Sequence, residues 1–197
     1  KILPQILQEK TDGRDYIRNI FSKKDKVYQQ AAEETSGQVL TYQGDLKLLP
    51  WHKVSGGKTR SGKEAFRDEE YTYLKSVDSS LDKEAPDYVS STYIFSSQLP
   101  AKLVLKKRDS AGYVTALTAD GNWIEGQTFC QGMHLASADF SVQKIGKMVR
   151  FLCKGKGNGL GLSQYGGHEM AKNGSSWEEI RLTYFPEMKI EEIGEVE

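Results

Sequence analysis

Hydrophobic residues recur along this chain at two spacings, one typical of helices and one typical of strands. Tyr16, Ile20, Val27 and Ala31 follow the helical spacing and predict a helix over about residues 14–34. Short stretches rich in β-branched and aromatic residues, bounded by turn-forming residues, predict strands at 38–42, 47–51, 72–77, 91–96, 111–118, 122–125, 138–143 and 147–153.

Capping signals predict shorter helices and complete the fold class. One helix is expected at 61–66, and Ser163 and Gly174 bound a second over 164–173. Ser176 and Glu179 form a Ser-x-x-Glu capping box for a third over 177–184. With a hairpin turn expected about residues 43–45 and no internal repeat, the pattern predicts an α+β, strand-rich mixed domain with short helices. A chain of 197 residues is long enough for one such domain.

Glycines are concentrated between residues 155 and 167, where six of thirteen residues are Gly. Because glycine lets a backbone approach another group closely, the run predicts a ligand-binding loop between a strand and a helix. Three familiar glycine motifs do not fit. The dinucleotide fingerprint, the phosphate loop and the nucleophile elbow need glycine at the positions of Leu160, His52 and Tyr165 respectively. Neither nucleotide nor hydrolase-elbow chemistry follows.

The charge balance and the lengths of the apolar runs each remove one class of partner. Lys and Arg together number 27, as do Asp and Glu, so the net charge is zero. Nucleic-acid binding usually needs a basic surface, and no nucleic-acid partner is expected. No apolar run approaches the roughly 20 residues of a membrane span, so this segment is expected to make no membrane contact.

The two cysteines, Cys130 and Cys153, leave three alternatives open. They could form a disulfide, remain buried free thiols, or contribute to a metal site with His134. One Cys and one His at helical spacing supply only half of a tetrahedral zinc site. Buried free thiols are the favoured alternative, and no metal and no cofactor are expected.

A second glycine loop follows His52 and offers a histidine, a hydroxyl and a lysine. Ser55 and Lys58 also match the Ser-x-x-Lys of serine acyl-enzymes, although the accompanying Ser-Asp-Asn and Lys-Thr-Gly elements are missing. The structural alternative is a tight turn at Gly56 and Gly57, with His52 capping a strand end. Cleft lining by hydrogen-bonding side chains and exposed amides is the functional alternative.

The helix start at Ser163 offers groups of the kind that bind sugars. Ser163 alone is explained as an N-cap. Gln164 can donate and accept hydrogen bonds, and Tyr165 offers a flat face and a hydroxyl, unless Tyr165 packs into the core. The adjacent acidic pairs are not acid/base pairs, because neighbouring helical residues point in different directions; they are Glu33/Glu34, Glu69/Glu70 and Glu178/Glu179.

The run from Gly155 to Gly167, with Met170-Ala171-x-x-Gly174 after it, resembles a known signature. It is similar to the Ser-Gln-Tyr-Gly pattern of the stage II sporulation protein D family, bacterial peptidoglycan lytic transglycosylases related to the amidase-enhancer proteins. His52-x-x-Ser-Gly-Gly-x-Thr59 matches a second family block. Weaker blocks occur in the family's order at 34–42, 73–77 and 177–186, so the resemblance covers about residues 27–192, after a helical lead-in at 1–26.

The resemblance implies cleavage of the glycosidic bond between the amino sugars of peptidoglycan. One carboxylic acid would protonate the leaving oxygen and then act as base while the sugar's own hydroxyl closes an anhydro ring. The residues implied to bind the glycan, across one cleft lined by the two glycine loops, are His52, Ser55, Gly56, Gly57, Asn158, Ser163, Gln164 and Tyr165.

Two departures from the family pattern limit what is carried over. Asn158 stands where the family has a loop histidine. The family's catalytic glutamate lies in an upstream helix with no counterpart in this chain, which would precede Lys1 in a longer protein. The zinc-binding loop of some relatives also has no counterpart. The catalytic residue is therefore unknown.

The resemblance leaves two functions open. The chain is expected to be part of a lytic transglycosylase, or else a non-catalytic module that binds peptidoglycan and enhances an amidase. Its expected partners are peptidoglycan glycan strands and a cell-wall amidase or another sporulation wall enzyme. Its expected place is extracytoplasmic, in the cell envelope, through a secretion signal or anchor outside this chain.

Overall fold

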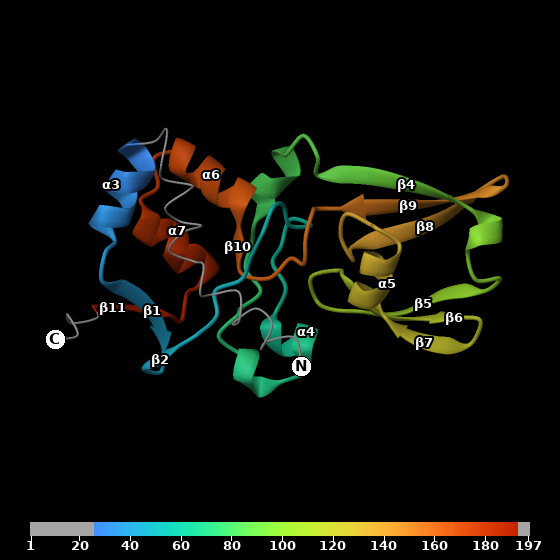
Figure 1. Ribbon diagram of the computed structural model, residues 1–197, viewed down its shortest axis with the longest axis horizontal. Coiled ribbons are helices and arrows are strands. Elements are labelled where there is room, and N and C mark those ends of the chain that lie inside the picture. The colour runs from blue at the N-terminus through green and yellow to red at the C-terminus, as the bar shows by residue number, and fades with distance from the viewer. Residues whose placement is uncertain (1–25, 193–197) are drawn as a thin grey trace. The chain divides into compact units, whose positions relative to one another are not determined.

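The computed structural model describes residues 26–192 and has the α+β, strand-rich fold class that the sequence predicts (Figure 1). The α-helices are α3 (Lys26–Glu34), α4 (Gly62–Phe66), α5 (Gly126–Gly132), α6 (Gln164–Lys172) and α7 (Trp177–Tyr184). The 3-10 helices are η2 (Glu69–Tyr71), η3 (Ser80–Glu84) and η4 (Ser96–Gln98). The strands are β1 (Gln38–Tyr42), β2 (Asp45–Leu46), β3 (Trp51–His52), β4 (Val89–Phe95), β5 (Leu103–Arg108), β6 (Val114–Ala119), β7 (Asn122–Glu125), β8 (Phe140–Ile145), β9 (Met148–Lys154), β10 (Leu162–Ser163) and β11 (Lys189–Glu192).

The chain divides into two compact units, and the larger one contains every candidate site residue. The first unit is Lys1–Leu40 with Ile190–Glu197, of which the structure describes α3, most of β1 and most of β11. The second is Thr41–Lys189. The helical lead-in predicted at 1–26 lies almost wholly outside the described residues. The single family domain predicted over 1–197 stays a prediction.

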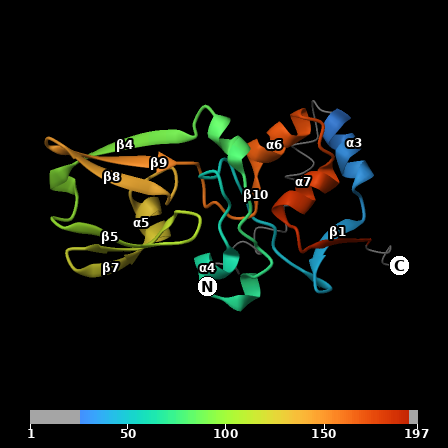
Figure 2. The ribbon, with the colours of Figure 1, turned by 180° about the vertical axis from the view of Figure 1, so that it is seen from behind.

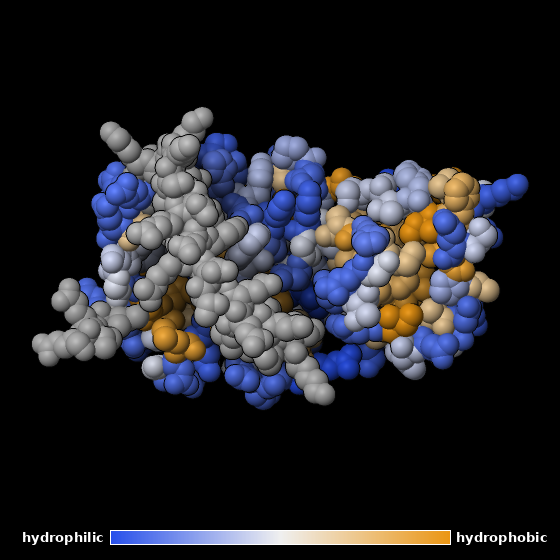
Figure 3. All heavy atoms as spheres, in the orientation of Figure 1, coloured by the Kyte–Doolittle hydropathy of each residue, from blue (hydrophilic) through white to orange (hydrophobic). Residues whose placement is uncertain are grey.

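Two three-stranded antiparallel sheets and α5 share the main hydrophobic core of the larger unit. The strand orders are β4-β9-β8 and β5-β6-β7, and α5 lies between the two sheets in both views (Figures 1 and 2). The core combines side chains of β6, α5, β8 and β9, including Leu117, Phe129, Phe140 and Phe151. Hydrophobic residues also reach the surface over this region (Figure 3), where Phe95 and Trp123 are exposed.

Short helices pack around a small parallel strand pair in the rest of the larger unit. β10 pairs with β3, and α6 contacts η3, α7 and β10 (Figure 2). No helix among residues 26–192 is long and apolar enough to cross a bilayer.

Local capping and turn signals predicted several elements correctly. The Ser163 hydroxyl accepts a hydrogen bond from the amide of Gly166, and both halves of the Ser176–Glu179 capping box are formed. Gln43 and Gly44 have φ of 55° and 86° between the paired residues Tyr42 and Asp45. Positive φ at both central residues fits a two-residue hairpin turn. The second hairpin strand is therefore Asp45–Leu46, not the predicted 47–51.

The strand predicted at 72–77 is wrong. Residues 69–71 form η2, and the backbone of Lys75 and Val77 makes hydrogen bonds to Thr59, which belongs to no strand. The Thr59 hydroxyl donates to Lys75 O and accepts from Val77 N, while Thr59 N donates to Val77 O. One buried threonine thus satisfies groups that a sheet partner would otherwise bind.

β5, α5 and β11 were not predicted, and neither were the two-residue strand β10 and the 3-10 helices η2, η3 and η4. β5 is an edge strand whose second half, Lys106 to Arg108, is exposed and polar, and its pairing with β6 contains a register irregularity. α5 begins and ends with glycine, which disfavours helices. It is stabilised by the burial of Phe129 and Cys130 in the core. Tertiary packing therefore overrides local propensity there.

Candidate functional site

The two glycine-rich motif segments lie directly against each other. β3 and β10 pair in parallel, with Trp51 opposite Leu162 and His52 opposite Ser163. Beyond the strands, Val54 N donates to Lys156 O and Lys156 N donates to Val54 O. Residues over a hundred positions apart in the sequence thus form one structural unit, whereas the cleft expected between the two glycine loops stays a prediction. The two segments meet through backbone hydrogen bonds.

Glycines of the 155–161 segment permit this close approach of two backbones. A Cβ at Gly155 would lie 2.7 Å from the Val54 carbonyl oxygen, and one at Gly157 would lie 2.9 Å from the His52 Cβ. Both glycines have positive φ, 71° and 113°. Their conformational freedom is therefore used to pack one motif on the other.

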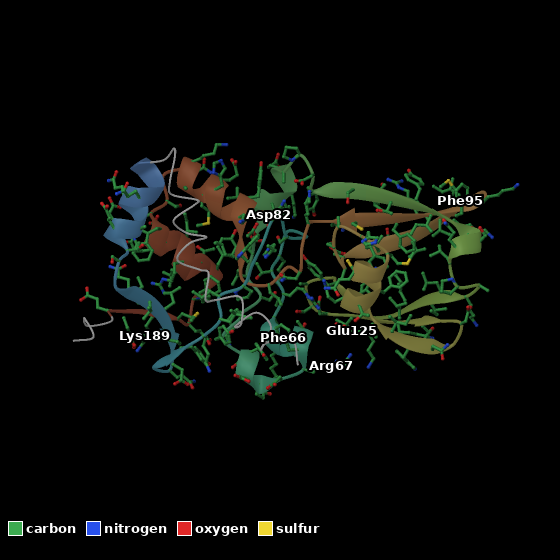
Figure 4. All side chains as sticks on the ribbon, viewed as in Figure 1. Phe66, Arg67, Asp82, Phe95, Glu125 and Lys189 are labelled. Carbon is green, nitrogen blue, oxygen red and sulfur yellow. The ribbon has the colours of Figure 1, made fainter. Side chains whose placement is uncertain are left out.

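A buried carboxylate, Asp82 on η3, organises the unit. Asp82 is fully buried and accepts three hydrogen bonds: from Ser163 Oγ at 2.7 Å, from Ser55 N at 2.8 Å and from Ser79 Oγ at 2.9 Å (its position is labelled in Figure 4). A buried charge is tolerated when hydrogen bonds compensate for its lost hydration. Asp82 thus ties η3 to both family motifs.

Tyr184 on α7 extends this network to the fourth residue of the Ser-Gln-Tyr-Gly motif. Its hydroxyl lies 2.8 Å from Ser79 Oγ. Since the Ser79 proton is directed at Asp82, Tyr184 donates to Ser79. A Cβ at Gly166 would collide with the Tyr184 hydroxyl and lie 2.9 Å from Ser79 Oγ. Glycine is required at 166 because the network occupies the space of any side chain.

His52 is a buried, neutral histidine. Its side chain is 2 % exposed, and Nδ1 donates to Leu160 O at 2.9 Å. Burial lowers the pKa of the His52 imidazole below its ordinary value. With Nδ1 protonated, Nε2 carries a lone pair, and no hydrogen-bond partner for it is found within residues 26–192.

Of the predicted site residues, His52, Ser55 and Ser163 are buried in the protein's own packing. Gly57 is also buried; its amide donates to Ser55 Oγ at 3.0 Å. Asn158 is half-buried, and its side-chain oxygen accepts from Leu160 N at 2.9 Å. These contacts shape the loops, and direct contact of these side chains with a sugar stays a prediction.

Gln164 and Tyr165 lie at the accessible edge of the unit. Gln164 is exposed and Tyr165 is half-buried. The Tyr165 amide donates to Lys53 O at 3.0 Å, which fixes the start of α6 beside β3. On β3 itself, His52 points into the protein whereas Trp51 is 57 % exposed. Trp51 and Gln164 are thus accessible at the junction of the two motifs.

A second network secures the glycine loop to the sheets. Arg60 Nε and Asp109 Oδ2 form an ion pair at 2.6 Å with both side chains almost fully buried, 6 % and 1 % exposed. Arg60 Nη1 donates to Asn158 O, and its guanidinium lies over the Tyr113 ring at 4.9 Å. Asp109 also accepts the amides of Ala111 and Tyr113, so the predicted strand at 111–118 begins only at Val114.

The cysteines are both free and buried. This confirms the favoured alternative over the disulfide. Burial raises the pKa of the Cys130 thiol to about 11, which keeps the thiol protonated and unreactive at neutral pH. Within the described part of the chain, no three His, Cys, Asp or Glu side chains cluster as metal ligands would.

Among the described residues, the larger unit has cavities of which two are relevant here. One, of about 370 Å³, is lined by Gly56 of the second motif together with Arg108, Asp139 and Lys154. The other, of about 280 Å³, is lined by residues that include Phe66, Arg67 and Glu125, which are labelled in Figure 4. Only the first includes a predicted site residue.

Sequence reasoning missed Asp82, Trp51 and Asp139. Asp82 lies among Ser80, Lys83 and Glu84, all exposed, so its surroundings in the sequence resemble a solvated surface. Trp51 directly precedes the His52 motif. An aromatic residue beside that motif was the signal that could have identified it as a candidate site residue. Asp139 carries no local signal, because it reaches Gly56 only through the fold.

Comparison with known proteins identifies the relatives of this chain. No family model matches it. It is 31 % identical to stage II sporulation protein D of Bacillus amyloliquefaciens over 91 % of this chain and 54 % of that protein. It is 28 % identical to stage II sporulation protein D of Bacillus subtilis (strain 168), over 95 % of this chain and 58 % of that protein. The chain thus spans little more than half the length of these relatives. It belongs to the stage II sporulation protein D family.

Proposed function

We propose that this chain binds the glycan strands of peptidoglycan and forms part of a lytic transglycosylase that remodels the cell wall during sporulation. The observation that carries the proposal is the parallel pairing of β3 with β10. It joins the two sequence blocks that carry the family resemblance, and both Trp51 on β3 and Gln164, the first residue of α6 after β10, are exposed.

The chemistry of this edge suits a sugar ligand. An exposed indole ring offers a flat apolar face for a sugar ring, and Trp is energetically dominant in many interfaces. The Gln164 amide can donate and accept hydrogen bonds to hydroxyl or acetamido groups. The Asp82 network holds the start of α6 in place, so these groups are positioned before a ligand arrives, which lowers the entropic cost of binding.

Co-sedimentation with insoluble purified peptidoglycan tests the proposal. The unmodified chain is expected to sediment with the polymer, and Trp51→Ala and Gln164→Ala are expected to weaken binding, Trp51→Ala by about tenfold or more. Trp123→Ala and Gln131→Ala are matched controls, because these residues are also exposed but belong to β7 and α5. Equal losses from the controls, or no sedimentation of the unmodified chain, would refute glycan binding at this edge.

Mass spectrometry of the soluble fraction separates binding from cleavage. Anhydro-sugar products would show that this chain contains the catalytic acid. Binding without products, combined with stimulation of an added cell-wall amidase, would favour the enhancer alternative.

A further inference from the structure

The cavity beside Gly56 has a fixed floor. Gly56 N donates to the Tyr113 hydroxyl at 3.3 Å, and Gly56 O accepts from the Tyr88 hydroxyl at 3.1 Å. The backbone N–H and C=O of Gly56 are therefore both held by tyrosine side chains from other segments. A motif glycine thus forms a rigid part of a cavity wall.

The carboxyl group of Asp139 stands against this floor. A Cβ on Gly56 would lie 2.7 Å from Asp139 Oδ2, and one on Gly112 would lie 3.7 Å from the same oxygen. Glycine at both positions leaves room for the carboxyl. The Asp139 side chain is 13 % exposed, and its ion pair with Arg108 is long, 3.6 Å. Within residues 26–192, no hydrogen bond reaches its two oxygens.

Donors surround this carboxyl at the cavity rim. Arg108 Nη1 and Nη2 donate to the carbonyl oxygens of Gly112 and Phe140 at 2.5 and 2.6 Å, so the guanidinium is held in place with other N–H groups uncommitted. Lys154 lines the cavity with an exposed side chain. The cavity therefore presents an acceptor with unused capacity next to fixed and mobile donors.

We infer that the cavity beside Gly56, which Asp139 lines, is a subsite for one sugar residue of a glycan strand. This inference rests on the proposed function. Asp139 accepts hydrogen bonds from a sugar hydroxyl or an acetamido N–H. Arg108 and Lys154 donate to hydroxyl or carbonyl oxygens. About 370 Å³ lies in the range of small-molecule sites, and mixed donors and acceptors match a polar, largely neutral ring better than a simple ion.

Calorimetry tests the subsite. It measures how tightly soluble glycan chains prepared from peptidoglycan bind to the full 197-residue chain. Asp139→Asn keeps the shape but removes the charged acceptor, and affinity is expected to fall about tenfold or more, as for loss of a hydrogen bond to a charged group. Gly56→Ala is expected to weaken binding too, because its methyl group meets only the Asp139 side chain and displaces the carboxyl. Glu84→Gln, which removes an exposed carboxylate outside the cavity, is expected to bind like the unmodified chain.

The outcomes separate the subsite from the proposed function. Tight binding by the unmodified chain, Asp139→Asn and Gly56→Ala alike would overturn the subsite and leave glycan binding intact. No binding by the unmodified chain would overturn both. If Asp139→Asn does not fold in a thermal melt, Gly56→Ala decides, because its added methyl group touches no backbone atom in the structure.

Discussion

Ser163 Oγ donates to Asp82 Oδ1 at 2.7 Å, although 81 positions separate the two residues in the sequence. Ser163 Oγ also accepts a hydrogen bond from the amide of Gly166 at 3.2 Å and so caps α6. One hydroxyl therefore begins a helix and anchors it to η3. The serine of the Ser-Gln-Tyr-Gly motif positions the groups beside it, Gln164 and Tyr165.

Replacing this serine is expected to reduce stability. Ser163→Ala removes an N-cap and leaves Asp82, which is fully buried, with one hydrogen bond fewer. The free energy of unfolding is expected to fall by about 1–3 kcal/mol in urea denaturation. Ser97→Ala, at an exposed serine, is the control. Unchanged stability with lost glycan binding would instead move the hydroxyl into the binding site.

Gly166→Ala is expected to be more harmful than an ordinary helical glycine substitution. Its Cβ would collide with the Tyr184 hydroxyl inside a packed network, and overpacking typically costs about 1–3 kcal/mol. For a chain of this size each kcal/mol lowers the melting temperature by about 2–4 °C. Gly132→Ala in α5, where a Cβ would meet nothing within 4 Å, should change it little.

Tyr184→Phe provides an internal check on that explanation. It removes the hydroxyl that the new methyl group would meet, so Gly166→Ala combined with Tyr184→Phe should lose less stability than the two single losses added together. Strict additivity in a double-mutant cycle would show that the collision is elsewhere.

Local signals predicted the helix caps and the hairpin turn, because each depends on residues within three or four positions. The Ser176–Glu179 capping box and the turn at Gln43-Gly44 are examples. The glycines at 155 and 157 were predicted to admit a ligand, whereas they admit the backbone of residues 52–55. Glycine reports that something comes close and does not report what it is. Asp139 lies beside Gly56 only because the strands bring them together.

The buried Arg60–Asp109 pair is expected to be far more sensitive than an exposed pair. Arg60→Ala leaves the Asp109 carboxylate, 1 % exposed, without its cation, and breaking a buried pair in this way typically costs about 3–5 kcal/mol. Lys63→Ala breaks the exposed Lys63–Glu69 pair, for which about 0–1 kcal/mol is expected. Denaturant titration of both variants measures the difference. Similar losses in the two would show that burial of the Arg60 pair contributes little.

The Asp139 carboxylate is expected to cost stability at neutral pH. Burial raises the pKa of Asp139 above its ordinary value, and Asp109 raises it further, although Lys154 and Arg108 act in the opposite direction. The folded protein therefore holds this proton to a higher pH than the unfolded chain does. Protonation favours folding at pH below the ordinary Asp pKa of about 3.9, and this advantage is lost as the pH rises through the raised pKa.

Asp139→Asn removes this titration, so at pH 7 its melting temperature is expected to be higher than that of the unmodified chain. The difference should shrink as the pH falls toward the ordinary Asp pKa of about 3.9, because an increasing fraction of the unmodified carboxyl is then protonated. Thermal melts of both proteins between about pH 4 and pH 7 measure this difference in melting temperature. A group that destabilises the fold while it lines a cavity is typical of a binding site. A lower melting temperature for Asp139→Asn at pH 7 would instead assign the carboxylate a structural role through its ion pair with Arg108.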